Sequence, residues 1–397
     1  MRSVQNECMN PADLDSTDLS DLVSLRRDLH AHPETAFDEH RTAALVAQHL
    51  EDWGLEVHTG LARTGVVGIL RRGSGPALGL RADMDALDME EVADISYRSS
   101  FPGRMHACGH DGHVAMLLGA ARQLCRKADF HGSVHFIFQP AEENEAGGRV
   151  MVQEGLFERF PMHAVFGLHN RPGMPVGQMG LCPGPAMAAA DFFDLTLSGG
   201  GGHGGYPHKS ADPVVAAAQI VSGWQTLVSR QTDPLESAVI SVTRIHGGST
   251  CNVIPAEVEL SGTVRSLKQE VQQRLEAGMR RMAEGIAAAH GVQAHLDYAR
   301  RYRPTVNNPA ESALMLRAMR ATVGKGKVDG NLPPTMGAED FGWLLERCPG
   351  AYGVIGNGTE GAHGCGLHSP GYDFNDAAIP NGVAFWCNLV AEFFSSR

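Results

Sequence analysis

SVHFIFQPAEEN (residues 133–144) joins a short apolar run of strand character to a pair of adjacent glutamates. The same order, an apolar run followed by acidic or imidazole side chains, recurs at ALGLRADMDA (77–86) and HAVFGLHN (163–170). Helical patterns, notably VAMLLGAARQLC (114–125), alternate with these runs. The alternation predicts an α/β domain with a largely parallel, mixed sheet. Ligand sites of such sheets lie in the loops beyond the carboxyl ends of the strands.

The middle of the chain has a different pattern. Strand-like runs and two helical stretches follow one another in the order β-α-β-β-α-β, at 191–199, 212–230, 237–247, 257–266, 268–290 and 295–299. This order predicts a compact, ferredoxin-like α+β module. Helix and strand alternation returns after Pro304. We therefore expect one discontinuous domain, formed by residues 1–187 and 304–397, with a second domain inserted at 188–303.

Composition excludes several classes of protein. A net charge of −12 and the lack of a concentrated basic face disfavour a nucleic-acid binder. No apolar run reaches the ~18 residues of a membrane span, and the first residues lack the apolar stretch of a secretory signal, so we expect a cytoplasmic protein. The eight cysteines are scattered, which in a reducing compartment predicts free thiols, ligands or catalytic groups.

Possible metal ligands gather in five short segments, each interpreted as lying just beyond a strand. They are ADMDA (82–86), HACGHDGH (106–113), AEEN (141–144), LHN (168–170) and LHSP (367–370). A metal site needs lone-pair donors brought together from several elements. One histidine-rich loop would be a weak signal, but five such loops at one sheet predict a metal centre.

The adjacent pair Glu142 and Glu143 suggests a division of roles. Neighbouring residues in an extended stretch point to opposite sides. One carboxylate would then coordinate metal while the other faces substrate and water. The alternative is a solvated acidic pair on a turn, which the preceding apolar strand and the other donor segments disfavour.

Taken together, the motifs resemble the M20 metallopeptidase family, in its subgroup of N-acyl-amino-acid amidohydrolases with hippurate hydrolases and auxin-conjugate hydrolases. The resemblance rests on LRRDLHAHPE (25–34), GLRADMDAL (79–87), MHACGHDGH (105–113), FQPAEEN (138–144), GLHN (167–170), GGHGGYPH (201–208), NVIP (252–255), GAEDF (337–341) and GLHSPGYDFND (366–376). These motifs follow the family's order over nearly the whole chain. The resemblance implies that the discontinuous domain is catalytic and that the inserted one is a lid and dimerisation domain.

The resemblance also implies roles for particular residues. Five would ligate metal: Cys108, His110, Glu143, His169 and His368. Glu142 would be the general base, with Asp85 orienting a neighbouring ligand. His203 would reach the active site of a partner subunit, and Asn252 and Arg265 would contact the substrate carbonyl and carboxylate. His106 and His113 would be supporting residues.

The implied reaction is hydrolysis of an N-acyl amino acid to a carboxylic acid and a free amino acid by metal-activated water. The implied cofactor is a divalent metal, two ions per subunit, with Mn²⁺ or Zn²⁺ foremost and Co²⁺ or Ni²⁺ as alternatives. The implied partners are this small substrate and a second copy of the chain, in a homodimer or higher oligomer. Many M20 peptidases have a histidine ligand at the position of Asp83, so its contact with metal is left open.

The sequence departs from the family's pattern at three positions. Asp88 replaces the usual proline after DAL, and Asn144 replaces the common glycine after the glutamate pair. Arg171 stands where related hippurate hydrolases often have tryptophan. The first two changes concern loop geometry, and the third concerns the acyl or amino-acid pocket. None removes a proposed ligand.

Other functions compete with this one. Cys108 as a nucleophile, activated by His106 or His110, would leave the other donor segments without a purpose. An amino- or carboxypeptidase of the same fold would differ only in substrate. A non-catalytic binding protein of the family should have lost ligands or the base, and here all of them are present.

Overall fold

The computed structural model describes residues 8–127 and 129–395. Residues 1–7, on which the prediction of no secretory signal partly rests, lie outside the described residues. The chain divides into two compact units. The first comprises Met1–Ala186, Val306–Pro333 and Asp340–Arg397, and the second comprises Met187–Thr305 and Pro334–Glu339.

The first unit is built on an eight-stranded sheet in the order β1-β2-β4-β3-β5-β16-β6-β15. The strands are β1 (Glu56–Leu61), β2 (Gly65–Arg72), β3 (Ala77–Asp83), β4 (Gly132–Gln139), β5 (Ala164–Pro172), β6 (Met179–Leu181), β15 (Val328–Asp329) and β16 (Gly350–Gly358). The central strands β4, β3, β5 and β16 are parallel neighbours. Antiparallel pairs join β2 to β1 and to β4, and β6 to β16. The predicted α/β class with a mixed sheet is therefore confirmed.

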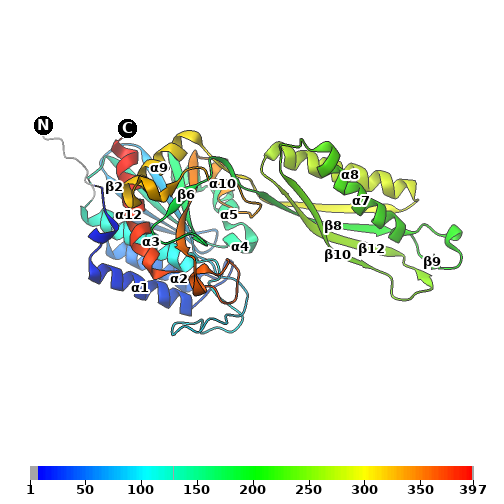
Figure 1. Cartoon of the computed structure of the whole chain (residues 1–397), viewed down its shortest axis with the longest axis horizontal. Helices are drawn as coiled ribbons and strands as arrows, with labels where there is room; N and C mark the ends of the chain where they lie inside the picture. Colours follow the sequence, from blue (N-terminus) through cyan, green and yellow to red (C-terminus); the bar gives the residue numbers. More distant parts are fainter. Residues whose placement is uncertain (1–7, 128, 396–397) are drawn as a thin grey trace. The chain divides into compact units, whose positions relative to one another are not determined.

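Five longer helices surround this sheet. They are α1 (Ser16–Ala31), α2 (His40–Asp52), α3 (His110–Lys127), α9 (Pro309–Val323) and α12 (Ile379–Ser395). Helix α12 packs against α3 and α9, and α1 packs against α3 (Figure 1). With Leu78, Leu80 and Phe136 of β3 and β4, these helices form one buried apolar cluster. Strands β3 and β4 are buried along their whole length, so their sequences are mostly apolar rather than alternating.

Shorter helical segments connect these elements. They are η1 (Pro11–Asp13), α4 (Glu142–Glu145), α5 (Gly147–Gln153), α6 (Leu156–Arg159), η3 (Lys325–Lys327), α10 (Gly342–Leu345), α11 (Gly361–Gly364) and η4 (Asp376–Ala378). The short strands β7 (Gly184–Met187) and β14 (Thr305–Asn307) lie at the points where the chain leaves and re-enters the first unit. No described helix is both long enough and apolar enough to cross a membrane.

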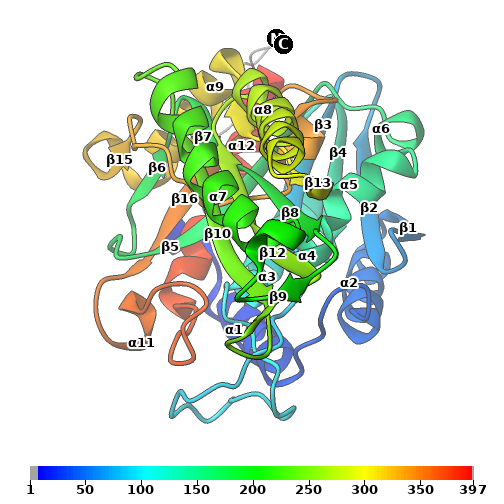
Figure 2. The ribbon, with the colours of Figure 1, turned by 90° about the vertical axis from the view of Figure 1, so that its right-hand side faces the viewer.

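The second unit has a four-stranded antiparallel sheet in the order β10-β12-β8-β13. Its elements are β8 (Ala189–Ser198), β9 (Gly202–His203), η2 (Pro207–Lys209), α7 (Pro213–Gln231), β10 (Ala238–Gly247), β11 (Val253–Ile254), β12 (Glu257–Ser266), α8 (Gln269–Ala289) and β13 (Gln293–Tyr302). Helices α7 and α8 lie side by side on one face of the sheet (Figure 2). The buried Trp224 of α7 donates its indole N–H to the carbonyl of Met279 in α8, at 3.0 Å.

The structure corrects the expectation that every donor segment directly follows a strand. AEEN does follow β4, but LHN lies inside β5. A long segment without a regular strand separates the end of β3 at Asp83 from His110, which begins α3. Helix α11 lies between β16 and His368. Donors therefore reach the sheet edge from a helix start and from loops as well as from strand ends.

The expectation that Glu142 and Glu143 lie in an extended stretch is wrong. Both residues belong to the short helix α4. The chain enters this helix through Ala141, whose φ of 55° is in the left-handed region and turns the backbone away from the strand direction. Helical neighbours diverge by about 100° instead of pointing to opposite sides, since a turn takes ~3.6 residues.

Candidate metal centre

Among the described residues of the first unit, three groups of side chains have donor atoms within 4.8 Å of one another. The groups are Asp83, His110, His113 and His169; Cys108, Glu143 and His368; and His110, Glu142 and Glu143. They share members, so they form one connected cluster. All five predicted metal ligands and the predicted base lie in it, together with Asp83 and His113.

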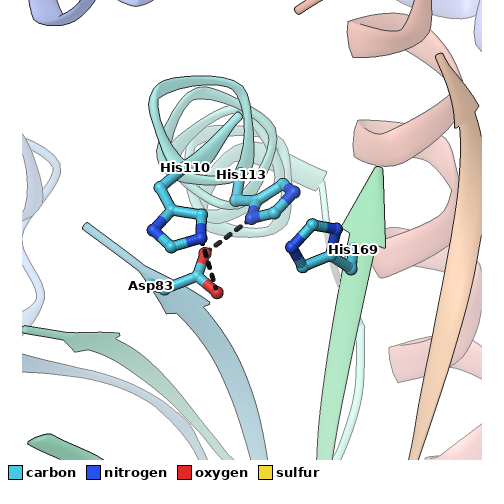
Figure 3. Close-up of side chains that lie close together, drawn as sticks. All are labelled: Asp83, His110, His113 and His169. Carbon is cyan, nitrogen blue, oxygen red and sulfur yellow. Dashed lines mark hydrogen bonds and ion pairs between the residues drawn. The ribbon is translucent and has the colours of Figure 1, made fainter. Parts of the chain in front are cut away.

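Strand pairing and a helix start bring part of this cluster together (Figure 3). The parallel pairing of β3 with β5 sets Arg81 opposite Gly167, so Asp83 and His169 reach the same edge two residues later. His110 and His113 come from the first turn of α3. Residues three apart on a helix lie on one face, so both imidazoles approach Asp83.

The ring of His110 is oriented as a metal-binding imidazole would be. Its Nδ1 lies 2.9 Å from the carbonyl oxygen of Asp85 and 3.2 Å from Oδ1 of the same residue. Both partners are acceptors, so Nδ1 carries a proton and Nε2 is directed to the cluster. Metal-ligating histidines commonly donate their other ring N–H to a carboxylate or a carbonyl. Asp85, for which an orienting role is predicted, therefore contacts the ring of His110.

His169 and Cys108 form a second pair of donors. His169 donates from Nδ1 to the carbonyl of Asn170 at 2.7 Å, which leaves Nε2 facing Sγ of Cys108 at 3.3 Å. Glu143 and His368 complete the arrangement, with Nε2 of His368 3.2 Å from Oε2 of Glu143. The backbone of His368 donates to the carbonyl of Ala107 at 2.9 Å, which ties its loop to that of Cys108.

His113 and Asp83 are held differently from the predicted ligands. Nε2 of His113 accepts the backbone N–H of Asn170 at 3.0 Å, and Nδ1 lies 2.5 Å from Oδ1 of Asp83. Both ring nitrogens therefore have partners, as a supporting residue requires. The other oxygen of Asp83 accepts from Arg81 at 2.7 Å. Burial raises the pKa of Asp83, but the charges of His110, Arg81 and His113 outweigh it and hold the pKa well below its usual range.

Within the described residues, two buried atoms of the cluster lack a hydrogen-bond partner. They are Nε2 of His110 and Oε1 of Glu143, which face each other at 3.8 Å. Burial lowers the pKa of His110, but Asp83, Asp85 and Glu143 outweigh it and raise the pKa to about 10. The carboxylates thus favour a positive charge at this point. Imidazole, thiol and carboxylate donors around such a point suit Zn²⁺ or Mn²⁺, so the residues fit a metal centre.

The surroundings of Cys108 argue against a nucleophilic thiol. The imidazole in contact with Sγ is that of His169, not that of His106 or His110. Burial raises the pKa of Cys108 well above its ordinary value, and the carboxylates of Glu143 and Glu142 raise it further. Reactive cysteines have lowered pKa values in electropositive surroundings. A neighbouring cation would instead favour the thiolate as a ligand.

Glu142 lies beside the donors of His110 and Glu143, and only 6% of its surface is exposed. Its Oε1 accepts the backbone N–H of Asp340 at 3.3 Å. The backbone N–H of Glu143 donates to Oδ2 of Asp85 at 3.0 Å, which fixes the helix that carries both glutamates. Glu142 therefore has a defined position next to the candidate ligands.

Asn170 is a supporting residue that the sequence pattern did not predict. Its side-chain nitrogen donates to the carbonyl of Cys108 at 2.6 Å, and its Oδ1 accepts the hydroxyl of Tyr372 at 2.8 Å. At Gly109, where φ is +89°, a Cβ would lie 2.3 Å from Nδ2 of Asn170. The only signal in the sequence was the asparagine next to His169 in LHN.

A buried ionic network at the start of α3 was also not predicted by the sequence pattern. His30 contacts Oδ2 of Asp111 at 2.9 Å and Oε1 of Glu91 at 3.2 Å. Arg26, fully buried, reaches the same Asp111 and Asp373. Burial lowers the pKa of His30, but its hydrogen bonds to the two carboxylates outweigh it and raise the pKa to about 9. Asp111 follows His110, so the network fixes the start of α3.

Replacing His30 with glutamine is expected to cost more stability at low pH than at high pH. A pKa raised from 6.5 to about 9 means that the stabilisation is fully present below pH 6.5 and is lost as the pH rises through 9. A pKa change of this size corresponds to roughly 3 kcal/mol in the free energy of unfolding. Urea unfolding of both proteins across this range should show the stability difference shrinking with pH. A difference independent of pH would contradict a charged His30.

The remaining predicted residues lie in the second unit. His203 pairs with Val253 through strands β9 and β11, and the carbonyl of Asn252 accepts the N–H of Gly204 at 2.8 Å. His203 and Asn252 are thus brought together. Arg265 lies at the other end of the adjoining strand β12, so the structure does not place it with them inside this unit. Its guanidinium lies over the ring of Phe192, 5.6 Å from the ring centre.

The three departures from the family's pattern occupy different settings. Asp88 is exposed and lies 3.6 Å from Arg104, and Asn144 is exposed on α4. Arg171 is half-buried in β5, two residues after His169. Alternate residues of a strand share a face, so Arg171 lies on the same side of β5 as His169.

Comparisons with known proteins agree with this geometry. Residues 79–392 match the sequence profile of Peptidase family M20/M25/M40. The chain is 40% identical to an N-acetylcysteine deacetylase of Bacillus subtilis over 373 residues, which are 93% of this chain and 96% of the relative. It is 36% identical to a hippurate hydrolase of Campylobacter jejuni over 374 residues, which are 94% and 96% of the two chains. Among solved structures, the YXEP protein of Bacillus subtilis, described as a dinuclear metal binding peptidase from the M20 family, superposes with a TM-score of 0.84 at 34% identity, covering 96% of this chain and 100% of that one.

Proposed function

Because the chain belongs to peptidase family M20/M25/M40, we propose that it is a metal-dependent amidohydrolase of N-acyl amino acids. It cleaves the amide bond and releases a carboxylic acid and a free amino acid. The observation that carries the proposal is the position of Glu142 beside a buried cluster of metal-capable donors. Relatives named for N-acetylcysteine and hippurate, both N-acyl amino acids, support this substrate class.

Cys108, His110, Glu143, His169 and His368 would hold the metal, which we propose to be two divalent ions per subunit. The dinuclear relative supports this number, and the mixed thiol, imidazole and carboxylate donors support Mn²⁺ or Zn²⁺, with Co²⁺ or Ni²⁺ as alternatives. When bound, such ions supply a Lewis acid that polarises the amide carbonyl and lowers the pKa of water toward ~7.

Glu142 moves the proton in the proposed reaction. Its carboxylate accepts a proton from the attacking water and delivers it to the amine nitrogen that leaves. The bond from Asp340 to Oε1 keeps the carboxylate in place during both transfers. Asp85 holds His110 by its ring and Glu143 by its backbone, so one residue orients two ligands.

The second unit is proposed to bind substrate and to form the dimer. Asn252 and Arg265 would contact the substrate, and His203 of the partner subunit would donate a hydrogen bond to the carbonyl oxygen as it gains charge. The exposure of His203 supports a role outside its own unit. We also propose a cytoplasmic location, which the eight free cysteines support because a reducing compartment keeps thiols unpaired.

Chelation followed by reconstitution tests the proposed function. Treatment with a chelator should abolish hydrolysis of N-acetyl, N-benzoyl and N-indoleacetyl amino acids, and one added divalent metal should restore it. Product amino acid would be measured for each metal in turn, with dipeptides assayed in parallel. Full activity after removal of all metal would contradict the proposal. Restored cleavage of dipeptides alone would favour the peptidase alternative, and metal binding without any hydrolysis would favour a binding protein.

A further inference from the structure

Glu39 is a fully buried carboxylate outside the cluster, and it joins three separate segments. Its Oε1 accepts the backbone N–H of Ala141 at 2.9 Å and that of Phe37 at 3.1 Å. Its Oε2 accepts the hydroxyl of Thr64 at 2.6 Å. The bond to Ala141 reaches the residue that directly precedes Glu142.

The Ala141 end of this bond is a strained point of the backbone. Ala141 has a φ of 55° and Ala146 has a φ of 53°, so both ends of the helix that carries the glutamate pair are in the left-handed region. Side-chain-bearing residues persist there only when their surroundings fix them. The carbonyl of Ala141 accepts from Gly147 at 2.8 Å, and its N–H donates to Glu39. Glu39 thus holds the backbone N–H of this turn.

Glu39 is not used to cap the helix that it precedes. It occupies the N-cap position of α2, but its side chain makes no cap hydrogen bond. The carboxylate of Glu34 does this instead, accepting from the N–H groups of Arg41 at 2.9 Å and Thr42 at 2.8 Å. Local helix stability therefore does not account for the direction of the Glu39 side chain.

The segment around Glu39 also contacts the loop of Asp85. The carbonyl of Glu34 accepts the N–H of Ala86 at 2.8 Å, and Thr35 forms a parallel bridge with Ala86. Asp85 in turn accepts the N–H of Glu143 at 3.0 Å. Residues 34–39 thus connect the loop of the orienting carboxylate with the turn of the glutamate pair.

We propose that Glu39 is a positioning residue, which sets the direction of the Glu142 and Glu143 carboxylates by holding Ala141 in its left-handed conformation. The inference rests on the proposed function of these two glutamates. For this role the length of the Glu39 side chain matters more than its charge, because two of its three partners are backbone N–H groups at fixed positions. Burial raises the pKa of Glu39 to about 7, so protonated and ionised forms are present in similar amounts near neutral pH.

Three variants separate reach from charge. Glu39→Gln keeps an oxygen at the position that accepts from Ala141 and Phe37, and kcat should stay within about threefold of wild type. Glu39→Asp keeps the carboxyl group but is one methylene short of Ala141, and Glu39→Ala loses all three bonds. Both should lower kcat by about 10- to 100-fold with KM within about twofold, since a misplacement of ~1 Å costs that much. Asp18→Ala is the control, because Asp18 is a buried carboxylate bound to Gln123 and Arg126 away from the cluster.

The visible absorption of the Co²⁺-loaded protein is the second readout, since it reports the ligand geometry without any substrate. Glu39→Asp and Glu39→Ala should change this spectrum, and Glu39→Gln and Asp18→Ala should not. An unchanged kcat and spectrum in Glu39→Asp, with thermal stability lowered as in Asp18→Ala, would reduce Glu39 to a structural residue. If Glu39→Ala does not fold, the pair of Asp and Gln variants decides. If no amide is hydrolysed by the wild type, the proposed function fails, and the spectra still test the positioning role.

Discussion

Glu142→Gln is expected to lower kcat by about 10²- to 10⁴-fold while metal content and fold stay unchanged. Proton transfer is the one function of the Glu142 carboxylate that glutamine cannot take over, because an amide does not accept and return a proton at neutral pH. Its oxygen can still accept the backbone N–H of Asp340, now at 3.3 Å from Oε1, so the side chain keeps its position. Loss of activity would therefore report lost proton transfer and not lost structure.

The matched control for this variant is Glu145→Gln. Glu145 is an exposed carboxylate on the same short helix, so the change in charge is the same and the helix is the same. Its kcat should equal that of wild type. Metal content would be measured by elemental analysis and kcat with the best N-acyl amino acid. Wild-type turnover in Glu142→Gln would show that another group acts as the base.

Cys108→Ser is expected to weaken metal binding by about 100-fold or more, since losing a ligand should cost at least as much as losing the residues that orient one. Cys108 is buried, and its Sγ faces Nε2 of His169 at 3.3 Å. A serine hydroxyl is a harder and less acidic donor than a thiol. Activity should return when metal is added in excess, because the base is intact.

Metal affinity and turnover together separate the two roles considered for Cys108. Cys125→Ser is the control, because Cys125 lies on the same helix as His110 but fifteen residues further along, roughly 22 Å away. Its affinity for metal should be that of wild type. If Cys108→Ser retains metal fully yet has no turnover at saturating metal, the cysteine is a nucleophile. Full metal occupancy with full activity would show that Cys108 is neither a metal ligand nor a nucleophile.

The sequence by itself determined the strands, the long helices and the donor types. Runs such as 133–140 and 163–169 are apolar because both faces of the central strands are covered, and β4 and β5 occupy 132–139 and 164–172. The helical periodicity of 114–125 also depends only on residues close in the sequence, and α3 spans 110–127. The residue types of the donor segments can be read without a structure. So many thiols, imidazoles and carboxylates in short segments indicate a metal site.

Only the tertiary structure decided how the donors are used. Ala141 has no sequence signal for its left-handed conformation, yet that turn places Glu142 and Glu143 on a helix instead of a strand. Only the family resemblance separates His113 from His110 in the sequence; in the structure a backbone N–H from Asn170, 57 residues away, occupies one nitrogen of His113. Glu39 and Ala141 are 102 residues apart, and His30 and Asp111 are 81 apart. Such contacts depend on which distant segments the sheet and helices bring together, and on the direction of each side chain there. Local periodicity carries neither kind of information.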